Sequence, residues 1–212
     1  MKRELEQFLA KWPSQVISDT DIFCFFETAS HKGRKDVIQR AISWGWLQRV
    51  KRGLYLVGPP FCSEKPSLFE LAQHIYGPSY ISMESALSFH GMIPEAVYAT
   101  VSACAKRSCE YETSLGLFLF HHMPVPYFYE GVEKVQNNQG FFLMASPLKA
   151  LGDYVYSKKK SYLSMTDLQK DLRLDVEVLK AQSLGLLKSL VSHYPSQRVK
   201  EFYQLIHNEL FS

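Results

Sequence analysis

Residues 34–57 read RKDVIQRAISWGWLQRVKRGLYLV, and this stretch decides the fold. Its first part, residues 34–44, places apolar side chains at helical spacing, which predicts a helix that buries one side. Gly45 is suited to end that helix in a left-handed conformation. Two apolar runs then flank residues 51–53, a short loop that contains the glycine a hairpin turn needs. The stretch therefore predicts a helix followed by a β-hairpin.

Two further helices are expected upstream of this stretch. Apolar residues at helical spacing predict a first helix over residues 2–12, which Pro13 ends. Ser18 then offers a hydroxyl N-cap with acids in the following turn, so a second helix is expected around residues 22–26. Helix, helix, turn, basic helix and basic hairpin is the order of a winged helix-turn-helix. We assign this DNA-binding domain to residues 1–58.

The net charge of +3 is distributed unevenly along the chain. Residues 1–58 carry ten Lys and Arg against six Asp and Glu, and residues 59–145 carry four against eight. Within residues 28–58 there are seven basic side chains and one acid. A basic segment beside an acidic one indicates a polyanionic partner at one end of the chain. A solvated basic face is the alternative interpretation.

The basic side chains lie on the two elements that would touch DNA. The major groove is about 12 Å wide and admits one helix, whose polar face offers donors to base edges. A hairpin tipped with Lys and Arg lies against the flanking phosphates. We therefore expect a double-stranded DNA operator as partner, bound by eight residues: Lys32, Arg34, Lys35, Gln39, Arg40, Arg49, Lys51 and Arg52. A three-helix module that binds protein is the alternative.

A second domain is predicted beyond a proline-rich linker. Residues 59–66 contain three prolines and form the linker, and residues 67–212 form the second domain. Its pattern predicts two short helices, then short strands between residues 97 and 145, then helices from Pro147 onward. The predicted fold class is α+β: a winged helix-turn-helix, then a domain with a small antiparallel sheet and a helical C-terminal tail. We expect few contacts between the two domains.

Five runs of sequence carry a family resemblance: residues 40–42 (RAI), 52–55 (RGLY), 77–95 (GPSYISMESALSFHGMIPE), 146–151 (SPLKAL) and 153–154 (DY). Together they resemble the AbiEi family, the abortive-infection antitoxins of type IV toxin–antitoxin systems. The resemblance implies a winged-helix domain that represses its own operon. It also implies a C-terminal domain that neutralises a nucleotidyltransferase-like toxin. A solitary winged-helix transcriptional regulator, whose second domain senses a ligand or dimerises, is the alternative.

A winged helix alone reads only a few base pairs. We therefore expect a homodimer on an operator that is an inverted repeat, because two linked sites recover affinity through effective concentration.

No catalytic site, metal site or cofactor is predicted, and we expect the protein not to be an enzyme. Ser82 and His90 invite a catalytic interpretation, but they lie about 12 Å apart along a helix with a rise of 1.5 Å per residue. Ser82 is instead placed as an N-cap, with Glu84 in the first turn. His121 and His122 point to opposite faces of a strand, and the four cysteines lack metal-ligand spacing. A nuclease delivered to DNA is a further alternative.

The location of the protein is predicted from two further features. The longest apolar runs have five residues, whereas a membrane-spanning helix needs about 20. The start of the chain is amphipathic and lacks the apolar core of a secretion signal. We therefore expect a cytoplasmic protein.

Overall fold

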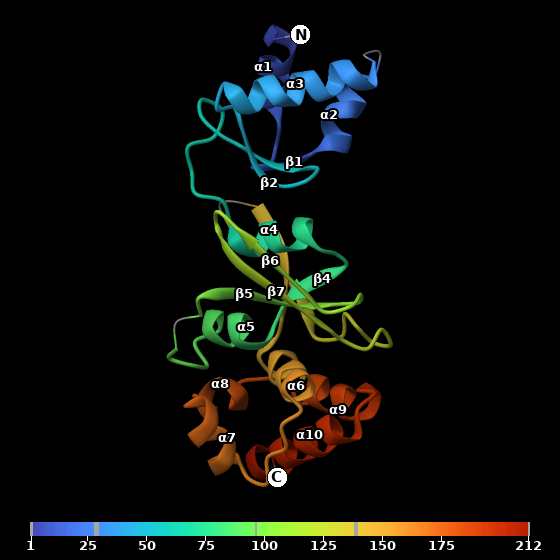
Figure 1. Ribbon diagram of the computed structural model, residues 1–212. Helices are drawn as coiled ribbons and strands as arrows, with labels where there is room; N and C mark the ends of the chain where they lie inside the picture. Colours follow the sequence, from blue (N-terminus) through green and yellow to red (C-terminus); the bar gives the residue numbers. More distant parts are fainter. Residues whose placement is uncertain (1, 28–29, 96, 138–139, 212) are drawn as a thin grey trace.

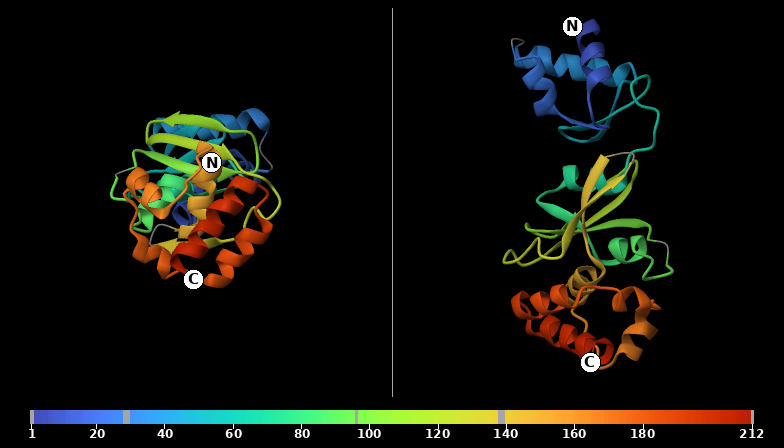
Figure 2. Two further views of the ribbon diagram at one scale, coloured as in Figure 1. Left: turned by 90° about the horizontal axis from the view of Figure 1, so that it is seen from below. Right: turned by 180° about the vertical axis from the view of Figure 1, so that it is seen from behind.

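The computed structural model describes residues 2–27, 30–95, 97–137 and 140–211. The fold is mixed α and β, and Figure 1 shows it as three layers that follow the chain from one end of the molecule to the other. Three helices and a small sheet come first, a larger sheet lies in the middle, and the C-terminal helices lie at the opposite end. Figure 2 shows the same order from behind.

The N-terminal module comprises residues 2–57. Its elements are α1 (Lys2–Lys11), β1 (Val16–Ser18), α2 (Asp19–Phe25), α3 (His31–Ser43), β2 (Leu47–Lys51) and β3 (Leu54–Val57). Strand β3 lies in the centre of the sheet and pairs antiparallel with both β1 and β2. The three helices and the hairpin were predicted. Strand β1 was not, because three residues are too few for an alternating pattern to be recognised.

Local signals explain where these elements begin and end. Ser18 and Asp21 form a capping box, since the Asp21 N–H donates to Ser18 Oγ (3.2 Å) and the Ser18 N–H donates to Asp21 Oδ2 (2.8 Å). Helix α3 begins at residue 31, earlier than predicted, because Ser30 Oγ accepts the N–H of residue 33. Gly45 and Gly53 have φ of +73° and +79°, the left-handed conformation that glycine adopts without strain.

The second module comprises residues 67–211. Its elements before the tail are α4 (Leu68–Ile75), β4 (Ser79–Ile81), α5 (Met83–Phe89), β5 (Ala99–Cys104), β6 (Cys109–Thr113), β7 (Gly116–His122), β8 (Val132–Asn137) and β9 (Gly140–Ala145). The helical tail consists of α6 (Pro147–Lys158), α7 (Met165–Leu172), α8 (Val176–Lys180), α9 (Leu184–His193) and α10 (Gln197–Leu210). The predicted start of the tail is confirmed, because Ser146 caps α6 and Pro147 occupies its first turn.

The prediction of a small antiparallel sheet in the second module was wrong. Its sheet has six strands in the order β6-β7-β5-β4-β9-β8. The pairs β5–β7 and β4–β9 are parallel, whereas the other three pairs are antiparallel. Strand β7 lies between β5 and β6. It pairs antiparallel with β6 and parallel with β5, so β7 runs in the same direction as β5. Alternation along a strand shows which face is buried but does not show which strands pair.

Some side chains of the small sheet reach the second module across the linker. Along β3, Tyr55 and Val57 belong to the buried cluster of the N-terminal module, whereas Leu54 and Leu56 belong to the buried cluster of the second module. That second cluster also contains Leu71, Ala72 and Ile75 of α4. The side chains of a strand alternate between its two faces. The small sheet is therefore covered on one face by its own helices and on the other by the second module.

Polar contacts add to this interface between the modules. Gln48 Nε2 of β2 donates to Ser114 Oγ (3.2 Å), and Ser14 Oγ donates to Glu70 Oε1 (3.3 Å). These bonds join residues that lie far apart in the sequence, on both sides of the linker.

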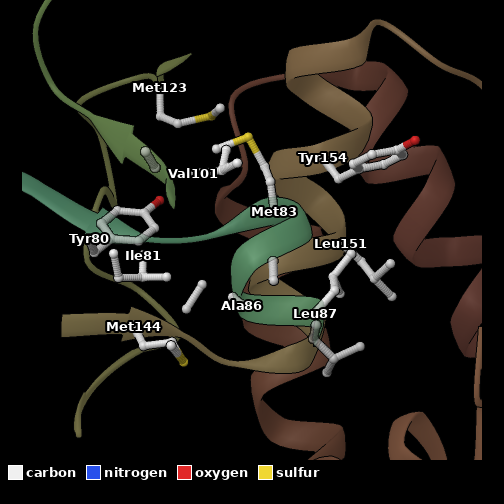
Figure 3. Close-up of a cluster of buried hydrophobic side chains, with 14 of the residues drawn as sticks. Tyr80, Ile81, Met83, Ala86, Leu87, Val101, Met123, Met144, Leu151 and Tyr154 are labelled. Carbon is white, nitrogen blue, oxygen red and sulfur yellow. The ribbon is translucent and has the colours of Figure 1, made fainter. Parts of the chain in front are cut away.

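Methionine and aliphatic side chains fill the core of the second module between its sheet and its helices. Figure 3 shows Ile81 of β4 and Met144 of β9 beside Ala86 of α5, with Leu151 projecting from α6. All four side chains are buried. Among the described residues, no helix has both the length and the apolar character required to cross a membrane.

A buried polar network crosses this core. Asp153 of α6 accepts hydrogen bonds from the Tyr80 hydroxyl (2.8 Å) and Ser82 Oγ (2.7 Å) on Oδ2. Its Oδ1 accepts the Tyr194 hydroxyl (3.0 Å) and lies 3.0 Å from Lys149 Nζ. Ser82 does precede α5, but its side chain makes no capping bond. The predicted N-cap position of Ser82 is therefore confirmed, but its hydroxyl donates to Asp153 and makes no capping bond.

Candidate nucleic-acid interface

Helix α3 presents one buried face and one polar face. Val37 and Ala41 are buried against the N-terminal module, as their spacing predicts. Lys32, Lys35 and Gln39 are exposed. Residues separated by three, four or seven positions share one side of a helix. These three side chains therefore form a single row on the exposed side of the helix.

A groove of about 490 Å³ lies between α3 and the β2–β3 hairpin. Its lining residues come from α2, α3 and the hairpin: Asp19, Phe23, Lys35, Ile38, Gln39, Arg49, Arg52 and Tyr55. Four of the eight predicted DNA-binding residues thus meet in one place. Lys35 and Gln39 lie on the helix side, and Arg49 and Arg52 lie on the hairpin side.

The groove has the chemistry of an anion-binding surface. In the described part of the chain, Lys35, Arg49 and Arg52 form no ion pair with a carboxylate. Arginine donates two parallel hydrogen bonds to phosphates and to guanine edges. Glutamine pairs with adenine by donating to N7 and accepting from the N6 amino group. Three cations without a carboxylate ion pair and one amide can therefore contact both the backbone and the bases of a duplex.

A β-bulge separates Lys51 from this groove. Arg49 of β2 stands opposite Tyr55, and Lys51 stands opposite Leu54, so one extra residue of β2 is inserted between the two pairs. In a regular strand, residues 49 and 51 would share a face. The bulge reverses the alternation and places Lys51 on the opposite face from Arg49.

The Lys51 side chain is therefore directed at the second module. Its Nζ donates to the Ile75 carbonyl oxygen at the end of α4 and lies 5.4 Å from the centre of the Tyr111 ring. Burial lowers the pKa of Lys51. Of the residues predicted to contact DNA, Lys51 is thus not brought to the groove, and the bulge responsible cannot be recognised from residue types alone.

The other predicted residues occupy three different positions. Arg34 is anchored at the corner between α2 and α3, where its Nη2 donates to the Glu27 carbonyl (3.0 Å) and its guanidinium lies 5.6 Å from the Phe23 ring. Lys32 continues the exposed row of α3 but does not line the groove. Arg40 is exposed on a neighbouring side of α3, also outside the groove.

Sequence reasoning missed two polar residues of the groove. Asp19 was noted only as an acid of a helix first turn, and Tyr55 only as a strand residue. Both assignments are confirmed, since α2 begins at Asp19 and Tyr55 lies in β3. Their meeting in the groove depends on how α2 packs against the hairpin, and no local pattern indicates it.

The different positions of Lys51 and Arg52 predict that substituting them has different effects on the salt dependence of DNA binding. Replacing Arg52 by methionine should lower the slope of log affinity against log salt by about 0.9, the contribution of one phosphate contact. Lys51→Met should leave the slope unchanged, because its ammonium contacts Ile75. Fluorescence anisotropy with duplex DNA at several salt concentrations measures both. Equal reductions in the two variants would contradict the placement of Lys51.

Comparison of the chain with protein-family models finds no matching family. Comparison with curated proteins finds no match. The likeness to the AbiEi family therefore stays a prediction that rests on the sequence runs quoted above.

Proposed function

We propose that the protein is a DNA-binding transcriptional autorepressor that also serves as the antitoxin of a type IV toxin–antitoxin system. The observation that supports DNA binding best is the groove that brings Lys35 and Gln39 of α3 together with Arg49 and Arg52 of the hairpin. A helix and a hairpin that share one cationic groove suit a duplex, in which a major groove lies beside phosphates.

The order of the elements gives independent support. Helix, strand, helix, helix, strand, strand, with the three strands in one antiparallel sheet, is the order of a winged helix-turn-helix. In this proposal α3 is the recognition helix and the β2–β3 hairpin is the wing. Gln39 and Lys35 face base edges in the major groove, whereas Arg49 and Arg52 face the flanking backbone.

The antitoxin role rests on the resemblance of residues 77–95 and 146–154 to the AbiEi family. In this proposal the second module acts against a nucleotidyltransferase-like toxin, and the protein binds an inverted repeat as a homodimer. Rescue of growth on co-expression with such a toxin from the neighbouring gene tests this part. A failure to rescue would leave a solitary regulator with DNA binding unaffected.

Variants of α3 test the DNA-binding groove. Lys35→Ala and Gln39→Ala should each weaken binding to the duplex upstream of the gene by about 2 kcal/mol, roughly thirtyfold, because each removes a contact in the groove. Arg40→Ala is the matched control, since Arg40 is equally exposed on the same helix but lies outside the groove. Fluorescence anisotropy on the upstream duplex and on a scrambled duplex provides the measurement.

The scrambled duplex separates base reading from backbone contact. Gln39→Ala should weaken binding to the upstream duplex more than binding to the scrambled one. An equal loss on both would show that Gln39 contacts only the backbone. A loss with Arg40→Ala as large as with Lys35→Ala would contradict the assignment of the groove as the binding site.

A further inference from the structure

Tyr55 forms part of the base of the groove and is almost completely buried, with 3% of its surface exposed. The guanidinium carbon of Arg49 lies 5.8 Å from the centre of the Tyr55 ring, within the range of a cation–π contact. Burial and the Asp19 carboxylate raise the pKa of the Tyr55 hydroxyl, while the Arg49 guanidinium opposes the shift. The hydroxyl therefore lies in the electrostatic field of both a carboxylate and a guanidinium.

Asp19 also contacts the tip of the hairpin. Its backbone N–H donates to the Gly53 carbonyl (3.0 Å), and a Cβ at Gly53 would lie 3.4 Å from Asp19 Oδ2. The start of α2 is thus fixed against the turn that carries Arg52. In the described part of the chain, Asp19 Oδ1 is buried without a hydrogen-bond partner, which leaves a negative oxygen in a groove of cations.

We propose that Tyr55 and Asp19 are positioning residues that hold the Arg49 guanidinium in the groove, ready for contact with DNA. The inference rests on the proposed DNA-binding function. An arginine on an exposed strand normally loses side-chain freedom when it binds a ligand, and that loss weakens binding. The ring of Tyr55 restricts Arg49 before DNA arrives, so less freedom is lost on binding, and Asp19 acts on Arg49 only through the Tyr55 hydroxyl.

A double-mutant cycle tests whether Tyr55 acts through Arg49. Tyr55→Phe keeps the ring and removes the hydroxyl, and it should weaken binding to the upstream duplex about fivefold. Arg49→Ala should weaken binding about tenfold or more. The double variant should bind like Arg49→Ala alone, because the hydroxyl then has no arginine to position. In a Lys35→Ala background, by contrast, Tyr55→Phe should retain its full effect.

Asp19→Asn provides the second variant in the same cycle and keeps the bond between the backbone of α2 and Gly53. Thermal unfolding of each variant monitors the fold. A purely structural role for Tyr55 predicts that its effect persists in the Arg49→Ala background, and that result would overturn the inference. An Arg49→Ala variant that binds as well as the unmodified protein would overturn it too, while leaving the function proposed for Gln39 intact.

Failure of the proposed function gives a different result. In that case the unmodified full chain itself fails to bind the upstream duplex, and both proposals are overturned together. Binding by the unmodified chain that Gln39→Ala weakens, combined with independent effects of Tyr55→Phe and Arg49→Ala, overturns only the positioning role.

Discussion

Replacing Asp153 by alanine should lower the free energy of unfolding by about 3–5 kcal/mol, because it breaks a buried ion pair and leaves one partner in place. The side chains of Lys149 and Asp153 are 5% and 0% exposed, and Lys149 Nζ lies 3.0 Å from Asp153 Oδ1. Without the carboxylate, the ammonium of Lys149 stays buried without a counter-charge. The hydroxyls of Tyr80, Ser82 and Tyr194 also lose their shared acceptor.

Denaturant unfolding of the full chain measures this loss. The control is the double variant Lys149→Met with Asp153→Leu, which replaces both charges by apolar side chains of similar size. It should be more stable than Asp153→Ala, because no unpaired charge is left in the core. A loss below about 1 kcal/mol for Asp153→Ala, which is no more than an average point substitution costs, would show that the network contributes little.

Gly152→Ala should destabilise the protein by about 3 kcal/mol, the upper part of the range for overpacked cores. A Cβ at Gly152 would lie 1.9 Å from the hydroxyl oxygen of Tyr203 and 2.5 Å from the ring carbon that bears it. Tyr203 is fully buried, and its hydroxyl donates to the Leu148 carbonyl (3.1 Å). The ring therefore cannot move aside without losing both its packing and its hydrogen bond.

A second glycine provides the matched control. Gly185 lies in helix α9, where the nearest atom to an added Cβ is Ser183 Oγ at 3.4 Å, an ordinary contact. Gly185→Ala should therefore be neutral or stabilising by up to about 1 kcal/mol, because alanine favours the helix. Thermal unfolding compares the two variants. Equal stability of Gly152→Ala and Gly185→Ala would contradict the packing described around Tyr203.

The N-terminal module could be predicted largely because its signals are local. A serine followed by an acid at Asp21 marks the start of α2, and glycines with positive φ mark the end of α3 and the turn of the hairpin. The six-stranded sheet could not be predicted in the same way. Its parallel pairs join strands that local alternation cannot match, such as β4 and β9, which are separated by 58 residues between Ile81 and Gly140.

In the candidate site, too, local signals could be predicted from the sequence, whereas the effects of packing could not. Lys35, Gln39 and Arg49 could be predicted because charge, amide and helical spacing are visible in the sequence. Arg34 and Lys51 carry the same charge signal, but packing directs them elsewhere. Residue type therefore indicates which side chains suit DNA, whereas the bulge in β2 and the corner between α2 and α3 decide which of them reach the groove.

DNA footprinting of the region upstream of the gene tests the central claim most directly. The unmodified chain should protect a defined stretch of the duplex. The variant in which Lys35, Gln39, Arg49 and Arg52 are all replaced by alanine should lose that protection while keeping its helical circular dichroism. Absence of any protected stretch with the unmodified chain, or equal protection by the fourfold variant, would contradict the assignment of the groove as a DNA-binding site.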